Sequence, residues 1–216
     1  MRHCWTEGER YGDGGIDGIY ALGFLTQCLQ QNRIREYLLG FYAFQVFNME
    51  HDCFTSREGN RIYSSDRHLR TPFPLSDWSD PLTCSSAVAL LLLRNLLVTE
   101  ELRGAGEYTG KLLLLYGAPR RWYAPGQRIA VEGAETHAGK ISFEVRASAD
   151  GSRIEATVAL PKDAKCPAIR IRLRHPQGKP MQSVRVNGKP ITSLDAKDEL
   201  VELVSPAGTV HVEAAY

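Results

Sequence analysis

The N-terminal half of the chain carries the apolar spacing of helices. Between residues 16 and 29, apolar residues recur at intervals of three, four and one, which predicts an amphipathic helix over about 17–31. Residues 33–49 are apolar on more than one side, so a second helix there is expected to be buried between neighbours. A third helix is predicted over about 84–101, around seven consecutive apolar residues. The first two helices are joined by a turn of one or two residues and should form an antiparallel hairpin.

In the C-terminal half, apolar and polar residues alternate as they do in β-strands. Apolar and polar residues alternate cleanly at 141–146, 169–174 and 210–214, which predicts strands with one buried and one solvent-facing side. Turn-forming pairs such as Asp150-Gly151 and Asn187-Gly188 separate the runs. Short strands divided by such turns predict an antiparallel β-sandwich. Its eight strands are expected near residues 111–116, 128–132, 140–148, 153–160, 168–174, 183–186, 200–203 and 209–214.

The two patterns predict an α+β chain in two parts, a helical segment over 1–107 and a β-sandwich over 108–216. The distribution of charge supports this division: residues 1–110 hold ten arginines, no lysine and fourteen acidic residues, whereas residues 111–216 hold sixteen basic and eleven acidic ones. An apolar content of 43% is ordinary for a globular protein. The net charge of +1 argues against nucleic acid or an anionic membrane as a partner.

The sequence lacks the motifs of several common kinds of functional site. The five cysteines show no CxxC spacing and the six histidines no HxH or HExxH spacing, so no disulfide framework, metal site or cofactor is predicted. There is no phosphate-binding loop, nucleophile elbow or dinucleotide-binding glycine pattern. No signal-peptide pattern follows Met1, and no apolar run approaches the roughly 20 residues of a membrane span. The chain is therefore expected to be soluble.

Three segments of the C-terminal half resemble a known superfamily. They are Ala118-Pro-Arg-Arg-Trp122, the stretch from Glu135-Thr-His-Ala-Gly139 into Ile141-Ser-Phe-Glu-Val145, and Met181-Gln-Ser-Val-Arg-Val-Asn-Gly-Lys-Pro190. Together they are similar to the junction in six-hairpin glycosidases, where an (α/α)₆ barrel is followed by an appended β-sandwich. The resemblance runs from about residue 55 to 216, at superfamily level. It implies that the helices belong to an incomplete α/α toroid, since a whole barrel needs twelve helices and three or four are predicted here.

This resemblance implies the C-terminal fragment of a carbohydrate-active enzyme, a glycoside hydrolase acting on a poly- or oligosaccharide, with the sandwich bracing the barrel. The segment after Met1 reads like the middle of a domain, so a missing N-terminal part is expected and the chain alone should be inactive. The parent protein is expected to be extracellular or periplasmic. The alternative is a non-catalytic carbohydrate-binding or structural sandwich module. Besides carbohydrate, the expected partners are that missing part or a second copy, through apolar surface left exposed.

The expected site lies in loops of the helical part. An irregular stretch over about 50–83 is long enough to suggest a functional loop. Enzymes of the similar toroid class carry carboxylates in loops at one mouth of the barrel, which makes Glu58 the predicted catalytic residue. Glycosidic hydrolysis needs a second carboxylate, and the glycine-rich segment before the first helix holds a second acidic group, Glu7, Glu9, Asp13 and Asp17. That segment should enter the same mouth as the Glu58 loop if the first helix is an inner barrel helix.

Five residues of these loops are predicted to contact substrate, either by charge or by stacking on sugar faces: Trp5, Tyr11, Asp13, Arg57 and Trp78. Each candidate has a structural alternative. Glu58 could be a solvated residue paired with an arginine, and acids before a helix are favoured by its dipole. The aromatic residues could belong to the core.

Overall fold

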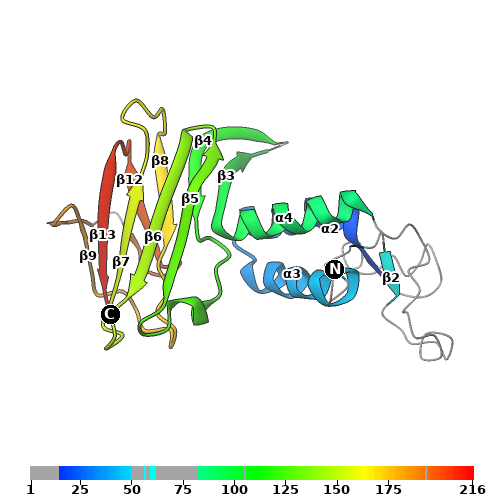
Figure 1. The fold of residues 1–216 in the computed structure, drawn as a ribbon. Helices are drawn as coiled ribbons and strands as arrows, with labels where there is room; N and C mark the ends of the chain where they lie inside the picture. Colours follow the sequence, from blue (N-terminus) through cyan, green and yellow to red (C-terminus); the bar gives the residue numbers. More distant parts are fainter. Residues whose placement is uncertain (1–14, 50–55, 57–58, 62–81, 105, 193) are drawn as a thin grey trace. The chain divides into compact units, whose positions relative to one another are not determined.

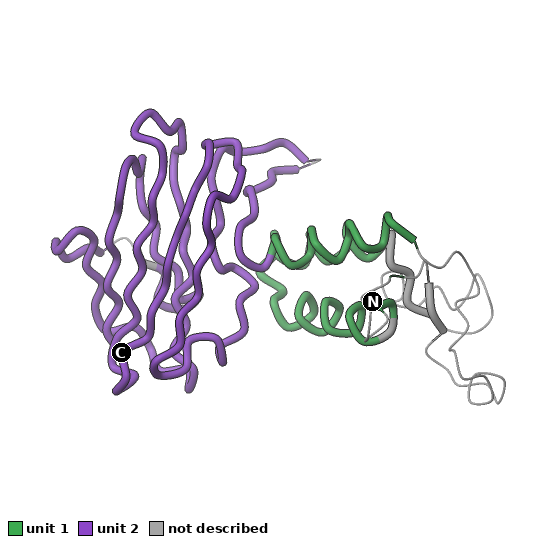
Figure 2. The backbone as a smooth tube through the Cα atoms, in the orientation of Figure 1, with its two compact units in different colours: residues 1–95 green, residues 96–216 purple. Residues whose placement is uncertain are grey.

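The computed structural model describes residues 15–49, 56, 59–61, 82–104, 106–192 and 194–216. It confirms the predicted α+β class, because three α-helices precede two β-sheets (Figure 1). Contacts divide the chain into two compact units, residues 1–95 and 96–216 (Figure 2). The helices are α2 (Gly18–Gln30), α3 (Ile34–Asn48) and α4 (Thr83–Leu97), and the short strands β1 (Gly15–Asp17) and β2 (Gly59–Arg61) pair in the first unit.

The first unit is organised around the α2–α3 hairpin. Asn32 adopts a left-handed conformation with φ of 57°, and the Arg33 amide donates to the Cys28 carbonyl at 2.7 Å, which closes the end of α2. Gly40 allows α3 to approach the side chain of Leu25 closely. Tyr37 is fully buried and donates its hydroxyl hydrogen bond to the Leu92 carbonyl of α4 at 2.5 Å. The apolar faces of all three helices therefore share one small core.

The third helix is shorter than the sequence predicts. It ends at Leu97 instead of about residue 101, and the chain continues directly into strand β3 (Val98–Arg103). Val98 and Thr99 pair with Leu114 and Leu113 of β4 (Glu107–Leu114), and the Leu115 amide donates to the Leu97 carbonyl at 2.8 Å. Pairing with the following strand, β4, thus overrides the local preference for helix.

The second unit is built from two sheets. The six-stranded sheet has the order β10-β9-β13-β7-β6-β5 and the five-stranded sheet the order β11-β12-β8-β4-β3. All pairs are antiparallel except β4–β8, so the five-stranded sheet is mixed. The remaining elements are the 3₁₀ turn η1 (Arg120–Tyr123) and strands β5 (Arg128–Thr136), β6 (Gly139–Ala147), β7 (Arg153–Ala159), β8 (Ala168–Arg172), β9 (Ser183–Val186), β10 (Lys189–Pro190), β11 (Leu194–Asp195), β12 (Leu200–Val204) and β13 (Thr209–Ala215).

Each of the eight predicted strands is present, and β3, β10 and β11 are additional. Alternate residues of both sheets point inward and form one apolar core, with Ile141 and Phe143 of β6 packed in the same cluster as Ile169 and Ile171 of β8. The predicted turn at Asn187-Gly188 has positive φ at both residues, as a type I′ hairpin requires. The sandwich core therefore follows from the period-two pattern of the sequence.

Truncation of Ile141 tests this core. Ile141 is fully buried, so Ile141→Ala should lower the free energy of unfolding by about 2 to 5 kcal/mol through lost burial and a cavity. Ile141→Val, the matched control, should cost only about 0.5 to 1.5 kcal/mol. Urea unfolding measures both, and equal losses in the two variants would contradict the packing described.

Candidate functional site

Except for Asp17, which ends strand β1, the residues that the sequence analysis proposes for the site fall outside the described part of the chain, so their roles stay predictions. They are Trp5, Glu7, Glu9, Tyr11, Asp13, Arg57, Glu58 and Trp78.

The described backbone nevertheless connects the two acidic segments in which the site is predicted. Strands β1 and β2 pair antiparallel, and the register places Asp17 directly opposite Gly59. Residues opposite each other in such a pair have Cα atoms about 4.5 to 5.5 Å apart. Gly59 follows Glu58 in the sequence, and β1 begins two residues after Asp13. The pairing therefore joins the end of the glycine-rich segment to the chain directly after Glu58.

Ser56, on the other side of Arg57 and Glu58, is also anchored in the first unit. It is buried and forms an isolated β-bridge with Met49. Its hydroxyl donates to the Leu82 carbonyl and lies 2.7 Å from the Ser86 hydroxyl, while the Leu82 amide donates to the Ser56 carbonyl at 2.9 Å. The described residues on both sides of the predicted catalytic position are thus held by backbone pairing, Ser56 to Met49 and Leu82, and Gly59 to β1.

The sandwich contains a second polar centre, an ionic cluster around Glu199. Arg120 of η1 donates two hydrogen bonds to the Glu199 carboxylate, at 2.6 and 2.8 Å, and one to the His175 carbonyl. The Nε atom of Arg174 lies 3.6 Å from the same carboxylate. Only 8% of the Glu199 side chain and 14% of the Arg174 side chain are exposed, against 41% for Arg120. A carboxylate that is so deeply buried requires these cations.

Arg172 lies beside this cluster and is fully buried. It donates to the carbonyls of Tyr116 and Asp198 at 2.8 and 3.1 Å, and its guanidinium carbon is 4.0 Å from the centroid of the Tyr116 ring. The sequence analysis expects the side of the 168–174 strand that carries Arg172 to face solvent. That expectation is wrong at Arg172, because the Tyr116 ring and the backbone around Asp198 cover it.

Burial changes the pKa values of arginine and tyrosine side chains around Glu199. Burial is the main cause that lowers the pKa of Arg174 to about 10, and the neighbouring Arg172 adds to the shift. Burial also raises the pKa of Tyr123 and Tyr216, whose hydroxyls donate to the carbonyls of Arg172 and Leu173 at 2.8 Å. At neutral pH Arg174 therefore stays charged and the two tyrosines stay neutral, which suits these side chains to anchoring the fold.

The sequence analysis did not identify this cluster. The signal was the alternation of arginines at positions 170, 172 and 174, which looks the same for a solvated strand face as for a buried ionic network. Trp122, in the segment that resembles the junction of six-hairpin glycosidases, is half-buried against the sandwich core.

In the described part of the chain, no group of three or more His, Cys, Asp or Glu residues is arranged to hold a metal ion. The described cysteines Cys28, Cys84 and Cys166 are free thiols. Within the same residues, no helix has the length and hydropathy that crossing a membrane requires.

Comparison with known proteins finds similarity only at the level of structure. No family model and no curated protein matches the chain. One solved structure, described as a glycoside hydrolase, is similar over 93% of this chain, with a TM-score of 0.38 and 13% sequence identity. The chain spans 29% of the length of that structure's chain. The comparison thus shows a partial structural resemblance to a glycoside hydrolase.

Replacing Glu199 tests the role of the ionic cluster. Glu199→Gln leaves Arg174 without its buried counter-charge, so the free energy of unfolding should fall by about 3 kcal/mol. Glu202→Gln is the matched control, because Glu202 pairs with Arg170 at 2.7 Å at a more exposed position and should contribute less than about 1 kcal/mol. Urea unfolding compares the two, and a loss in Glu199→Gln no larger than that of the control would show that the cluster does not anchor the sandwich.

Proposed function

We propose that the chain is the C-terminal part of a glycoside hydrolase that acts on a poly- or oligosaccharide, with its helices forming part of an α/α toroid. The pairing of β1 with β2 is the observation that carries this proposal. It joins the backbone that follows Glu58 to Asp17, so two acidic segments far apart in the sequence converge. Two carboxylates flanking a glycosidic bond are the usual requirement for its hydrolysis.

The exposed faces of the helices support a role within a larger helical array. On α3, Leu39 and Val46 lie about two turns apart and are 60% and 54% exposed, while the opposite face is buried. On α4, Leu90 is 69% exposed, and Leu91 and Leu93 are also exposed. A helix that is apolar on both sides is typical of a helix packed between neighbours. Further helices of the same protein, or a second copy, would bury these faces.

For the sandwich we propose a bracing role. From Lys140 onward the only Phe, Tyr or Trp residues are Phe143 and Tyr216. Phe143 is buried in the core, and the Tyr216 hydroxyl is engaged by the Leu173 carbonyl. The Tyr216 ring also lies against the His175 ring, at 5.2 Å between centroids, so these strands lack the several exposed rings of a stacking platform. The buried ionic cluster, in contrast, fixes the connection between the two sheets.

Hydrolysis assays test the proposed activity. The 216-residue chain alone should release no reducing sugar from a panel of polysaccharides, because it supplies only a few helices of the barrel. The polypeptide extended by its upstream reading frame should be active, and Glu58→Gln in it should lower kcat by roughly 10² to 10⁴-fold, the usual effect of losing a general acid or base. Glu132→Gln, on exposed strand β5, is the control and should retain activity. Full activity of the extended Glu58→Gln variant would exclude the assigned role.

Sedimentation velocity tests the exposed apolar faces. The 216-residue chain should self-associate as its concentration rises, because aliphatic surface on α3 and α4 is removed from water. The double variant Leu39→Lys/Leu90→Lys should shift the distribution towards monomer. Val204→Lys, at an equally exposed position of the sandwich, is the matched control and should leave association unchanged. A wild-type chain that stays monomeric at all concentrations would contradict the proposed packing of these faces.

A further inference from the structure

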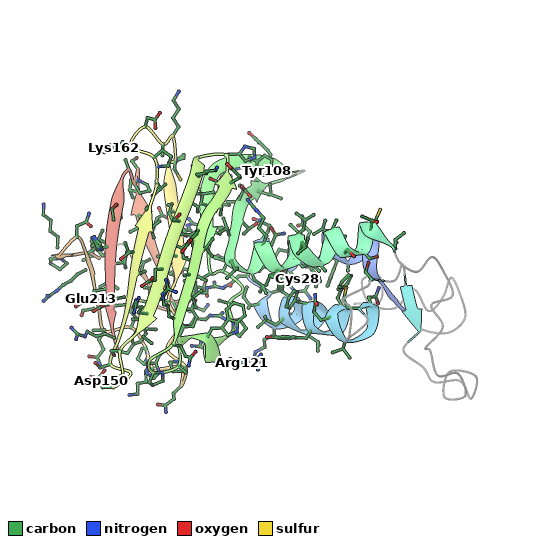
Figure 3. The ribbon with its side chains drawn as sticks, in the orientation of Figure 1. Cys28, Tyr108, Arg121, Asp150, Lys162 and Glu213 are labelled. Carbon is green, nitrogen blue, oxygen red and sulfur yellow. The ribbon has the colours of Figure 1, made fainter. Side chains whose placement is uncertain are left out.

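Helix α4 begins directly after a residue that is a poor helix cap. Leu82 precedes the helix, and its carbonyl accepts the first helical hydrogen bond from the Ser86 amide at 3.3 Å. Leucine has no side-chain oxygen with which to bind the free amides of the first turn. Apolar packing along the helix, in the core where Cys28 of α2 is buried (Figure 3), is non-directional and does not by itself select the first residue. The start of α4 therefore needs a further contact.

Ser56, which lies 26 residues before Leu82, supplies this contact. Its carbonyl accepts a hydrogen bond from the Leu82 amide at 2.9 Å, and its hydroxyl donates to the Leu82 carbonyl. The Ser56 hydroxyl also lies 2.7 Å from the Ser86 hydroxyl. Because a hydroxyl carries a single hydrogen, which Ser56 gives to Leu82, Ser86 is the donor in this second contact. Ser56, Leu82 and Ser86 thus form a closed set of hydrogen bonds, which we call the serine clasp.

The serine clasp is shielded from water and connected to the other helices. Only 1% of Ser56 is exposed, so little water competes for its hydroxyl. Ser56 forms a β-bridge with Met49, directly after α3. Gly59 pairs with Asp17, directly before α2. Ser56 and Gly59 are therefore joined to the ends of all three described helices, and Glu58 lies between these two residues in the sequence.

We propose that Ser56 is a positioning residue of the proposed hydrolase site, because the serine clasp fixes the chain two residues before Glu58 to the start of α4. The catalytic role of Glu58 rests on the proposed function, whereas the clasp consists of described residues alone. A single backbone hydrogen bond between Ser56 and Leu82 would let the two segments pivot about it. The two hydroxyl bonds add further points of contact and restrict this pivot, and catalysis is sensitive to displacements of about 1 Å.

Amide hydrogen exchange in the 216-residue chain tests the clasp without reference to activity. Ser56→Ala and Ser86→Ala each remove one hydroxyl, so the Leu82 amide should exchange about fivefold faster, in line with the net strength of a hydrogen bond. Ser85→Ala is the matched control, because Ser85 lies in the same turn, is fully buried and has a hydroxyl without a hydrogen bond to any described residue. It should leave the exchange unchanged. Exchange in either clasp variant no faster than in the control would overturn the proposal.

Kinetics of the polypeptide extended by its upstream reading frame test the positioning role. Ser56→Ala should lower kcat about 10- to 100-fold with little change in KM, because a displaced acid or base slows the chemical step more than it weakens substrate binding. Ser86→Thr, which keeps a hydroxyl at a half-buried position, should retain the wild-type kcat, and Ser86→Ala should not. A wild-type kcat in Ser56→Ala, or a fall in Ser86→Thr equal to that in Ser86→Ala, would overturn the positioning role. An inactive extended wild type would instead refute the proposed function, and the exchange data would still judge the clasp.

Discussion

The burial of the Glu199 carboxylate is the constraint on which the sandwich depends. A carboxylate removed from water destabilises a fold unless cations and hydrogen-bond donors surround it. Glu199 directly precedes β12, Arg174 follows β8 in the same sheet, and Arg120 lies in the segment that leads to the other sheet. One carboxylate therefore ties the crossover between the sheets to the five-stranded sheet. Glu199 itself has a φ of 57°, a strained backbone conformation that its contacts stabilise.

The parallel pairing of β4 with β8 explains why the crossover needs such an anchor. The chain leaves the five-stranded sheet after Leu114, forms β5, β6 and β7 in the six-stranded sheet, and then returns to place β8 beside β4. Parallel neighbours always require a long connection of this kind. Leu115, at the point of departure, is fully buried with a φ of 55°. Arg172 and Arg174 reach across to carbonyls at Tyr116 and Ala118 in the departing segment, so this turn is fixed where the path of the chain is least regular.

The candidate site could be foreseen only in part. Glycine, acidic and aromatic residues mark the two loops of the first unit as unusual, and the resemblance to six-hairpin enzymes suggests what they do. The pairing of β1 with β2 could not be predicted, because strands of three residues are too short to show a period.

The sequence by itself determined the class of the fold, the helical hairpin and the eight main strands with their buried faces. These features follow from periods of 3.6 and 2 and from turn residues such as Asn187-Gly188, all of which act over a few neighbouring residues. The tertiary structure decided where α4 ends, that β4 and β8 run parallel, and that Arg172 is buried instead of solvated. Each of these outcomes depends on a partner in another element, because backbone pairing between strands and the burial of a charge are satisfied only when the chain has folded.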